Sequence, residues 1–272
     1  MKRREVLLFT KRKVILLMLI FIILGKLYEI FPIFLLNDIG FSNNFGSFSR
    51  EYSYYSYYEN PSLGLKNRNS VFIYYNKYGY EELGVKIIST GFDLKDNNFN
   101  IYIYHFQEKP YKEEEYGFNF SKKIVKNIRA GITLKLLRLL IMEKRYLKFS
   151  YDLGVKFDFK KNHIFGFSLK DIERPNFKER VPMDFIFKYI YKKNRYGLFL
   201  KYTKIFGVYD YIVAGGDFEI NNFIRLLYGF NNKNKENRFG INISYKMFDF
   251  NFGYIVHSRL YPYIITEMGI RW

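Results

Sequence analysis

The sequence predicts an all-β protein, a closed antiparallel transmembrane β-barrel of about 14 strands. An N-terminal signal segment and a short lumen-plugging segment are expected before the barrel. Three observations carry this prediction: apolar and polar residues alternate along most of the chain, the alternating runs are long, and an apolar stretch follows a basic N-terminus. The expected division is a signal peptide at 1–25, an irregular plug segment at 26–69 and a barrel at 70–272.

The clearest alternation runs from Leu147 to Phe159, where every second residue is apolar and the residues between are polar, charged or glycine. Successive side chains of a strand point to opposite faces, so this run has one wholly apolar face. Similar runs, separated by turn-rich stretches, give the expected strands 70–78, 83–91, 98–107, 114–123, 127–140, 145–159, 162–171, 182–193, 195–205, 209–219, 222–231, 236–248, 249–258 and 261–272.

One stretch, Ile124 to Lys144, also has some helical spacing near its end. The chain alternates cleanly on either side of it. We therefore expect two strands there with a turn near Met142.

Strand length favours a membrane barrel over a soluble sandwich. Crossing a bilayer takes about 9–11 residues per strand, whereas soluble strands are commonly half that length. The polar face is rich in Gly, Ser, Asn and opposite charges, which suits an enclosed interior. Lys148, Asp152, Lys156 and Asp158, all within the run from Leu147 to Phe159, are expected to be such paired opposite charges. Closing the sheet removes the unpaired edges that lipid does not tolerate.

The N-terminus resembles an export signal. Six Lys and Arg residues precede an unbroken apolar run from Val14 to Leu24. That run is too short to cross a bilayer alone, because a spanning helix needs roughly 20 residues. Cleavage is expected somewhere after Gly25, and a membrane anchor reaching Leu36 is the alternative.

The C-terminus has the form of an outer-membrane assembly signal. The last expected strand places Ile264, Met268, Ile270 and the terminal Trp272 on one face. A plain final strand is the alternative. Together with an export signal, this ending predicts localisation in the cell outer membrane, with the bilayer and the outer-membrane assembly machinery as partners.

Composition excludes several functions. The chain has no Cys, so disulfides, thiolate zinc sites and iron–sulfur clusters are ruled out. The net charge of +18 fits a polyanion partner or a general Lys-rich drift. Because the Lys residues are scattered and crowd the turns, we favour drift and expect no nucleic acid partner.

No catalytic, metal or cofactor motif is visible. His105, His163 and His257 fall on different expected strands with no HExxH spacing. The adjacent glycines at 215–216 lack a phosphate-binding pattern, and no Ser has a GxSxG setting. We therefore expect no enzyme, no metal and no cofactor.

Two segments carry a family resemblance. Gly40–Gly46 is followed by a Tyr-rich stretch and then by Asn60-Pro61-Ser62-Leu63-Gly64-Leu65. This opening resembles that of the FadL-like outer-membrane barrels, especially the PorV/PorQ group, and the ending "GYIVHSRLYPYIITEMGIRW" resembles that group's close. Ser62 stands where the group usually has Ala, and the chain ends in Trp instead of Phe.

The resemblance implies a fourteen-stranded barrel whose N-terminal segment enters the lumen, with Asn60, Pro61, Gly64 and Leu65 as the plug motif. It also implies either transport of hydrophobic small molecules or a role in a secretion system that handles secreted proteins. A structural scaffold and, last, a membrane-embedded enzyme are the alternatives from other classes. Taken alone, Asn60-Pro61 predicts an ordinary turn.

Overall fold

The protein is an antiparallel β-sheet protein, as the alternation predicts. The structure is a computed structural model that describes residues 56–63, 70–77, 84–108, 111–141, 144–175, 181–233, 235–256 and 262–271. One short helix, α2 (Ser56–Glu59), precedes the strands. The expected signal segment lies outside the described residues, and within those residues no helix is long and apolar enough to cross a membrane.

The strands follow one another along the chain and pair as successive hairpins. Their bounds are β1 (Ser70–Lys77), β2 (Gly84–Leu94), β3 (Asn97–Glu108), β4 (Tyr111–Val125), β5 (Ile128–Ile141), β6 (Lys144–Phe159), β7 (His163–Lys170), β8 (Asp184–Lys193), β9 (Tyr196–Ile205), β10 (Tyr209–Glu219), β11 (Ile224–Asn231), β12 (Glu236–Tyr245), β13 (Phe248–Val256) and β14 (Tyr263–Arg271).

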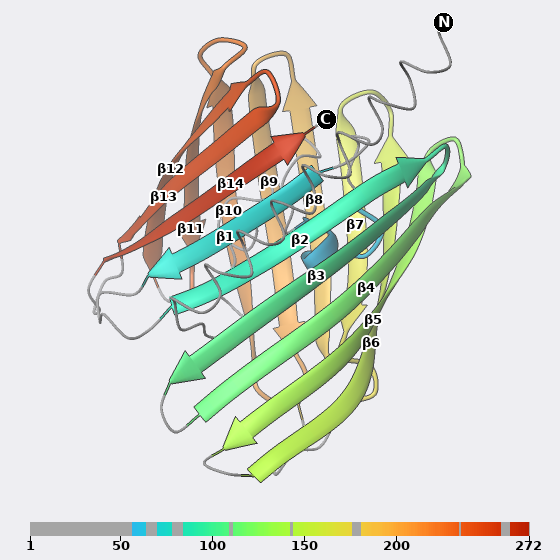
Figure 1. Ribbon diagram of the computed structural model, residues 1–272. Coiled ribbons are helices and arrows are strands. Elements are labelled where there is room, and N and C mark those ends of the chain that lie inside the picture. The colour runs from blue at the N-terminus through green and yellow to red at the C-terminus, as the bar shows by residue number, and fades with distance from the viewer. Residues whose placement is uncertain are drawn as a thin grey trace, which may run out of the picture.

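The strand order returns on itself. β1 pairs with β2 along one edge and with β14 along the other, from Ser70 opposite Arg271 to Lys77 opposite Ile264. The ring of strands is therefore a closed barrel. Figure 1 shows the long, tilted β2–β6 on one side of the barrel, with α2 enclosed by the strands.

Each range expected from the sequence corresponds to one observed strand, although the range 236–248 also includes Phe248, the first residue of β13. The stretch from Ile124 to Lys144 contains the end of β4 and all of β5, and no described part of it is helical. Differences are confined to strand ends: β2 runs on to Leu94 and β4 to Val125. The turns there are shorter than expected, and Lys95 takes a φ of 57° to make one of them.

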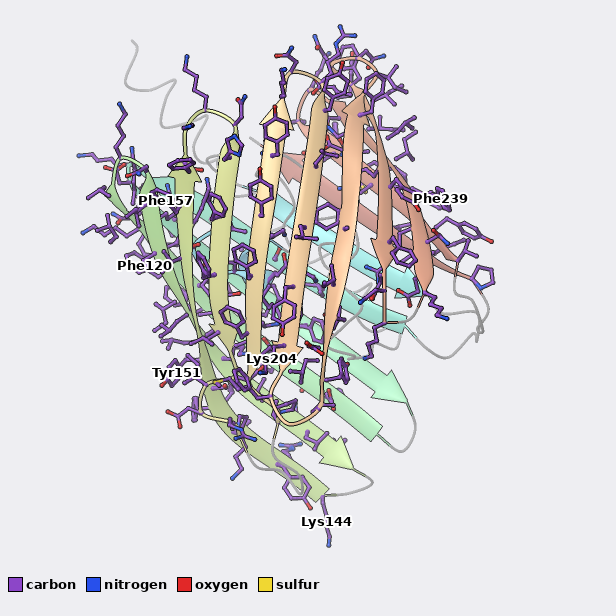
Figure 2. The ribbon with its side chains drawn as sticks, turned by 180° about the vertical axis from the view of Figure 1, so that it is seen from behind. Phe120, Lys144, Tyr151, Phe157, Lys204 and Phe239 are labelled. Carbon is purple, nitrogen blue, oxygen red and sulfur yellow. The ribbon has the colours of Figure 1, made fainter. Side chains whose placement is uncertain are left out.

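The two faces of the barrel wall differ sharply. On β5, Thr133 and Lys135 are 0% and 2% exposed, whereas Leu134 between them is 54% exposed. Figure 2 shows Phe120, Phe157 and Phe239 projecting from the outside of the wall. A wide apolar outer face over a polar interior is typical of barrels that sit in lipid.

The two ends of the barrel also differ. Consecutive strands are joined at one end by the short connections 95–96, 126–127, 160–162, 194–195, 220–223 and 246–247, and β14 also finishes there. The longest connection, residues 171–183, lies at the other end. That end also holds the tip of β6 at Lys144 (Figure 2).

Candidate functional site

The inside of the barrel holds a short peptide, residues 58–63, which we call the lumen segment. Asn60 folds it into a turn: its Oδ1 accepts hydrogen bonds from the Ser62 N–H at 3.0 Å and from the Ser62 Oγ–H at 2.7 Å. The Leu63 N–H donates to the Asn60 carbonyl at 2.9 Å. An Asn followed by Pro favours this local geometry, so the turn predicted at Asn60-Pro61 is present.

Polar groups on the inner wall hold the lumen segment from several strands. The Asn60 Nδ2 donates to the Phe167 carbonyl at 3.2 Å. The Asn119 Nδ2 donates to the Pro61 carbonyl at 3.1 Å, and the Ser168 Oγ–H donates to the Glu59 carbonyl at 2.9 Å. The backbone of the segment thus receives bonds from β4 and β7, which replace the water that a buried peptide would otherwise need.

Glycines on the inner wall make room for this contact. A Cβ on Gly131 would lie 2.1 Å from the Pro61 carbonyl oxygen, and a Cβ on Gly154 would lie 2.1 Å from the Asn60 Oδ1. These two glycines stand directly opposite each other on β5 and β6. Together they form a recess in the wall that fits the Asn60-Pro61 turn.

Glu59 is the charged centre of the segment. Its carboxylate is ion-paired with Lys188 of β8 and, at 3.1 Å from Oε1 to Nζ, with Lys201 of β9. Lys188 and Lys201 face each other across the β8–β9 ladder, and all three side chains are buried. The carboxylate therefore neutralises two lysines that would otherwise repel each other in a poorly solvated interior.

The two lysines also control the pKa of Glu59, which lies on α2 and not on a strand. Burial alone would raise this pKa, but attraction and hydrogen bonding to Lys188 and Lys201 outweigh burial. The pKa of Glu59 is lowered from 4.5 to about 2. Glu59 is therefore charged at any physiological pH.

Tyr58 adds an aromatic contact on the opposite side. Its ring stacks on Tyr104, with centroids 5.6 Å apart, and meets the edge of Tyr102 at 5.5 Å. The Lys170 ammonium lies 3.8 Å from its centroid. The Tyr102 hydroxyl donates to Glu115 at 2.5 Å, so a polar tip of this cluster is partnered by a carboxylate while the Lys170 cation covers the Tyr58 ring.

A second buried ion cluster corrects one expectation from the sequence. Asp152 is paired with Lys135 of β5, at 2.7 Å, and not with Lys148 of its own strand, which is exposed. Lys135 also lies 2.6 Å from Asp171, which follows β7. Residues four apart on a strand are more than 10 Å apart, so the partner of a buried charge comes from a neighbouring strand. Lys156 does pair with Asp158, at 3.2 Å.

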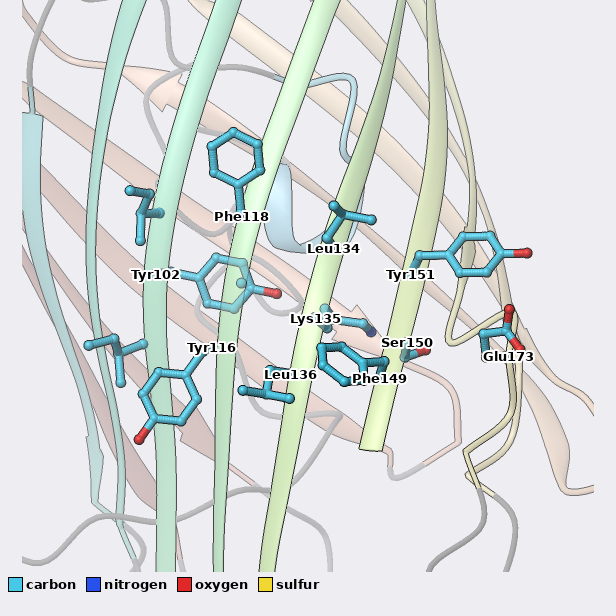
Figure 3. Close-up of a pocket in the computed structure, with 13 residues that line it drawn as sticks. Tyr102, Tyr116, Phe118, Leu134, Lys135, Leu136, Phe149, Ser150, Tyr151 and Glu173 are labelled. Carbon is cyan, nitrogen blue, oxygen red and sulfur yellow. The ribbon is translucent and has the colours of Figure 1, made fainter. Parts of the chain in front are cut away.

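The outer surface of β3–β6 bears a hollow of about 670 Å³, which we call the wall groove. Two rows of outward side chains border it: Ile101, Phe118, Leu134 and Tyr151 form one row, and Ile103, Tyr116, Leu136 and Phe149 form the other. Figure 3 shows Tyr102 and Lys135 between these rows. Gly117 lies in the floor, and a Cβ there would meet the Tyr102 ring at 2.0 Å, so only backbone separates the groove from the Tyr58–Tyr102–Tyr104 cluster at this point.

Pairing between β6 and β7 is incomplete beside the groove. Only Leu153–Phe159 of β6 pairs with β7. Among the described residues, 144–152 of β6 have no strand partner on this side, although the Ile172 N–H donates to the Tyr151 carbonyl at 3.2 Å. The wall is therefore least continuous where the wall groove ends.

The remaining predicted site residues divide into two groups, and two histidines, which were not expected to be ligands, are described after them. Ile264 and Met268 are exposed on the outer face of β14, and Ile270 is partly exposed on the same face. Gly64, Leu65 and Trp272 lie outside the described residues. His163 Nδ1 is 2.9 Å from the Tyr189 hydroxyl, and His105 Nδ1 is 4.0 Å from Glu114. Within the described residues, no group of three or more His, Asp or Glu is arranged to hold a metal ion.

No sequence pattern identified the residues that hold the lumen segment in place, which are Glu59, Lys188, Lys201, Gly131 and Gly154. The Lys residues are two among 44 Lys and Arg residues, and no local pattern marks them. Glycines at inward positions of adjacent expected strands were a usable signal. To recognise that these two glycines lie side by side, however, one must know the β5–β6 register, which the sequence does not provide.

No protein-family model matches the chain, and no curated protein matches it. Solved structures do match. The toluene transporter TodX of Pseudomonas putida has 10% identity and a TM-score of 0.62, covering 88% of this chain and 98% of that one. The CymD monoaromatic hydrocarbon channel has 8% identity and a TM-score of 0.63, covering 88% and 99%. A Pseudomonas aeruginosa FadL homologue has 10% identity and a TM-score of 0.51, covering 88% and 96%.

These matches show that the fold is that of FadL-like barrels. The FadL-like resemblance expected from the sequence is thus supported at the level of the fold.

Replacing either glycine of the recess by alanine is expected to displace the lumen segment. Gly131→Ala and Gly154→Ala each place a methyl group against Pro61 or Asn60, and overpacking of this kind costs about 1–3 kcal/mol. Unfolding in guanidinium chloride measures the loss. Gly240→Ala is the matched control, because its tightest contact, 3.1 Å, is to the end of the flexible Leu227 side chain. Equal stability of all three variants would show that the recess is not occupied.

Removing the charge of Glu59 is expected to destabilise the protein. Glu59→Gln leaves Lys188 and Lys201 buried without their carboxylate, and breaking a buried pair in this way costs about 3–5 kcal/mol. The free energy of unfolding at neutral pH measures this loss.

The same pair predicts an acid dependence. A carboxyl whose pKa falls on folding contributes stability that is complete above its unfolded pKa of 4.5 and is lost as the pH falls through about 2. The difference in stability between the native chain and Glu59→Gln should therefore shrink over this interval. A difference that is constant from neutral pH to pH 2 would mean that Glu59 is not held by the lysines.

Proposed function

We propose that this chain is an integral outer-membrane barrel of a bacterium with two membranes, and that it conducts small hydrophobic compounds past a luminal plug. The observation that carries the proposal is the lumen segment, which lies inside a barrel of FadL-like fold and is bonded to its inner wall. The two related structures named as hydrocarbon channels, TodX and CymD, support a substrate of monoaromatic type. The chain is not expected to be an enzyme.

Apolar surface for such a substrate occurs in two places. Most of the described inner wall is polar, but the rings of Tyr58, Tyr102 and Tyr104 form an aromatic surface beside the lumen segment. The wall groove offers a second apolar surface on the outside, directly behind Tyr102. We propose that a hydrophobic compound passes between these surfaces near Gly117 and the incomplete β6–β7 pairing, instead of crossing the full length of the charged lumen.

The orientation that we propose for the barrel in the membrane rests on the lengths of the connections at its two ends. The end with short connections and the end of β14 would face the periplasm, and the end with the 171–183 connection would face outward. Assembly would depend on the last strand, where Ile264, Met268 and Ile270 face outward, together with the terminal Trp272. The export signal at 1–25 would deliver the chain.

A secretion-system role of the PorV type is the second candidate. Its support is the resemblance of the Asn60-Pro61 opening to that of the PorV/PorQ group. Purification of the intact barrel separates the candidates: a secretion component retains exported proteins or other secretion subunits, whereas a hydrocarbon channel purifies without them.

Membrane placement is tested by charge insertion at two depths. Leu153→Arg, at an outward position near the middle of β6, should cost about 2–4 kcal/mol of stability in a bilayer. Ile124→Arg, at the end of β4, should cost about 0–1 kcal/mol. Reversible folding into phospholipid vesicles measures both values. Equal costs would contradict the assigned depth, and a chain that stays soluble without detergent would contradict the membrane location itself.

Transport is tested in bacteria that lack their own hydrocarbon channels. Cells that express the chain should take up labelled toluene faster than cells without it, while uptake of a polar solute such as arabinose stays unchanged. Tyr58→Ala should alter toluene uptake, and Tyr228→Ala, on the outer wall across the barrel, should not. Correctly inserted barrels that leave toluene uptake unchanged would refute the hydrocarbon channel.

A further inference from the structure

A charged group lies on the outer wall, beside the wall groove and toward the end with the 171–183 connection. It consists of Lys112, Glu114 and Arg138 with the nearby Arg145, and we call it the rim cluster. Lys112 and Glu114 lie on β4, Arg138 on β5 and Arg145 on β6. These positions share the outward face with Tyr116, Leu136 and Phe149, since side chains alternate along each strand. Charges on this face lie next to groups that line the groove.

Glu114 fixes the geometry of the rim cluster. The Arg138 Nη1 lies 2.6 Å from its Oε2, and the Lys112 Nζ lies 2.9 Å from its Oε1. The hydroxyl of Tyr116, a residue of the groove, donates to the same carboxylate at 3.3 Å. One carboxylate thus orients two cations and links them to the groove.

The cluster carries excess positive charge. Two cations, on Lys112 and Arg138, pair with one carboxylate, and His105 Nδ1 lies 4.0 Å from that same carboxylate. Arg145 on the next strand adds a third positive charge. Arg145 stands opposite Leu140, one outward position beyond the level of Arg138, and is exposed. The only acidic side chain among those lining the groove, Glu173, lies beside Tyr151 at the far edge (Figure 3). The positive end and the apolar groove therefore adjoin, with the Glu114 carboxylate joining Tyr116 to the cations.

We propose that the wall groove and the rim cluster form a binding site for an anionic, phosphate-bearing lipid of the surrounding membrane, with an acyl chain in the groove and a headgroup phosphate against Arg138 and Arg145. This inference rests on the proposed membrane location. Basic side chains at the level of the headgroups attract anionic lipids, and the adjoining outward rows are built from Ile, Leu, Phe and Tyr. A soluble anion would use the cations but would gain nothing from the groove.

The site has a structural consequence for the barrel. The unpaired part of β6, residues 144–152, carries Phe149 in the groove and Arg145 in the rim cluster. A bound lipid would cover this side of β6 where β7 does not reach. The acyl chain would thus occupy the outer end of the proposed path, so the lipid and a conducted compound would compete for the wall groove.

The test uses the purified, folded full chain in neutral detergent. Phosphatidylglycerol and phosphatidylcholine with identical acyl chains are added, and bound lipid is counted by native mass spectrometry. The native chain should retain phosphatidylglycerol in preference to phosphatidylcholine. Arg138→Ala/Arg145→Ala should weaken this retention roughly 30-fold at low salt, since each basic side chain near an anionic lipid contributes roughly fivefold.

The control is Lys122→Ala/Lys126→Ala, which removes two exposed cations from the opposite end of β4 and should leave retention unchanged. Equal retention of the two lipids by the native chain, or equal retention by both double variants, would overturn the lipid site. Displacement of the lipid by inorganic phosphate alone would also overturn it, because the site would then bind the anion without the groove. Heat-modifiable gel mobility and insertion into vesicles are recorded separately, so a chain that fails as a membrane barrel is distinguished from a barrel without this lipid site.

Discussion

A charged side chain that is removed from water must find its counter-charge nearby, and the interior of this barrel is organised around that requirement. Glu59 is 1% exposed and lies between two lysines of adjacent strands. Without the carboxylate, Lys188 and Lys201 would stand opposite each other in a site that neither could leave. The pairing therefore fixes where α2 ends, and the turn at Asn60-Pro61 follows into the recess at Gly131 and Gly154. Charge neutralisation and close packing select the same position for the lumen segment.

The architecture was largely readable from the sequence because strand alternation reports burial directly. Residues from Leu147 to Phe159 assign one face to the outside and one to the inside, and the structure has that sidedness across β6. Strand ends were less accurate. After Leu94 a tight turn with Lys95 at positive φ extends the ladder, and before Val125 the β4–β5 register shifts, and neither feature changes the alternation.

The interior contacts could not be predicted in the same way. Glu59 is separated by 129 residues from Lys188, and Asp152 takes its cation from another strand. Such pairs depend on the register and on the diameter of the ring, which no local spacing encodes. The sequence did place a turn at Asn60-Pro61 and a resemblance to plugged barrels, so it located the segment without locating its partners.

The structure gives this barrel two different surfaces on either side of one thin part of its wall. Inside, Tyr102 lies against Gly117 and Tyr58. Outside, the same glycine forms the floor of an apolar groove. Both surfaces offer apolar contacts to a poorly soluble compound or a lipid chain, whereas most of the described lumen wall is polar or charged. The proposed conduction of hydrophobic compounds and the proposed lipid site therefore depend on the same place in the wall, where Tyr58 of the lumen segment packs against Tyr102 on the inside.

Disulfide trapping tests the position of the lumen segment most directly. The chain has no Cys, so a pair introduced at Asn60 and Gly154 is the only thiol pair present. A Cβ on Gly154 would meet the Asn60 Oδ1 at 2.1 Å, and Asn60→Cys removes that oxygen, so the two Cβ atoms of the double variant can lie within the range of a disulfide. The folded Asn60→Cys/Gly154→Cys barrel should form this bond rapidly on mild oxidation, and mass spectrometry detects it. A correctly folded barrel whose two thiols stay free would show that the segment does not lie against β6.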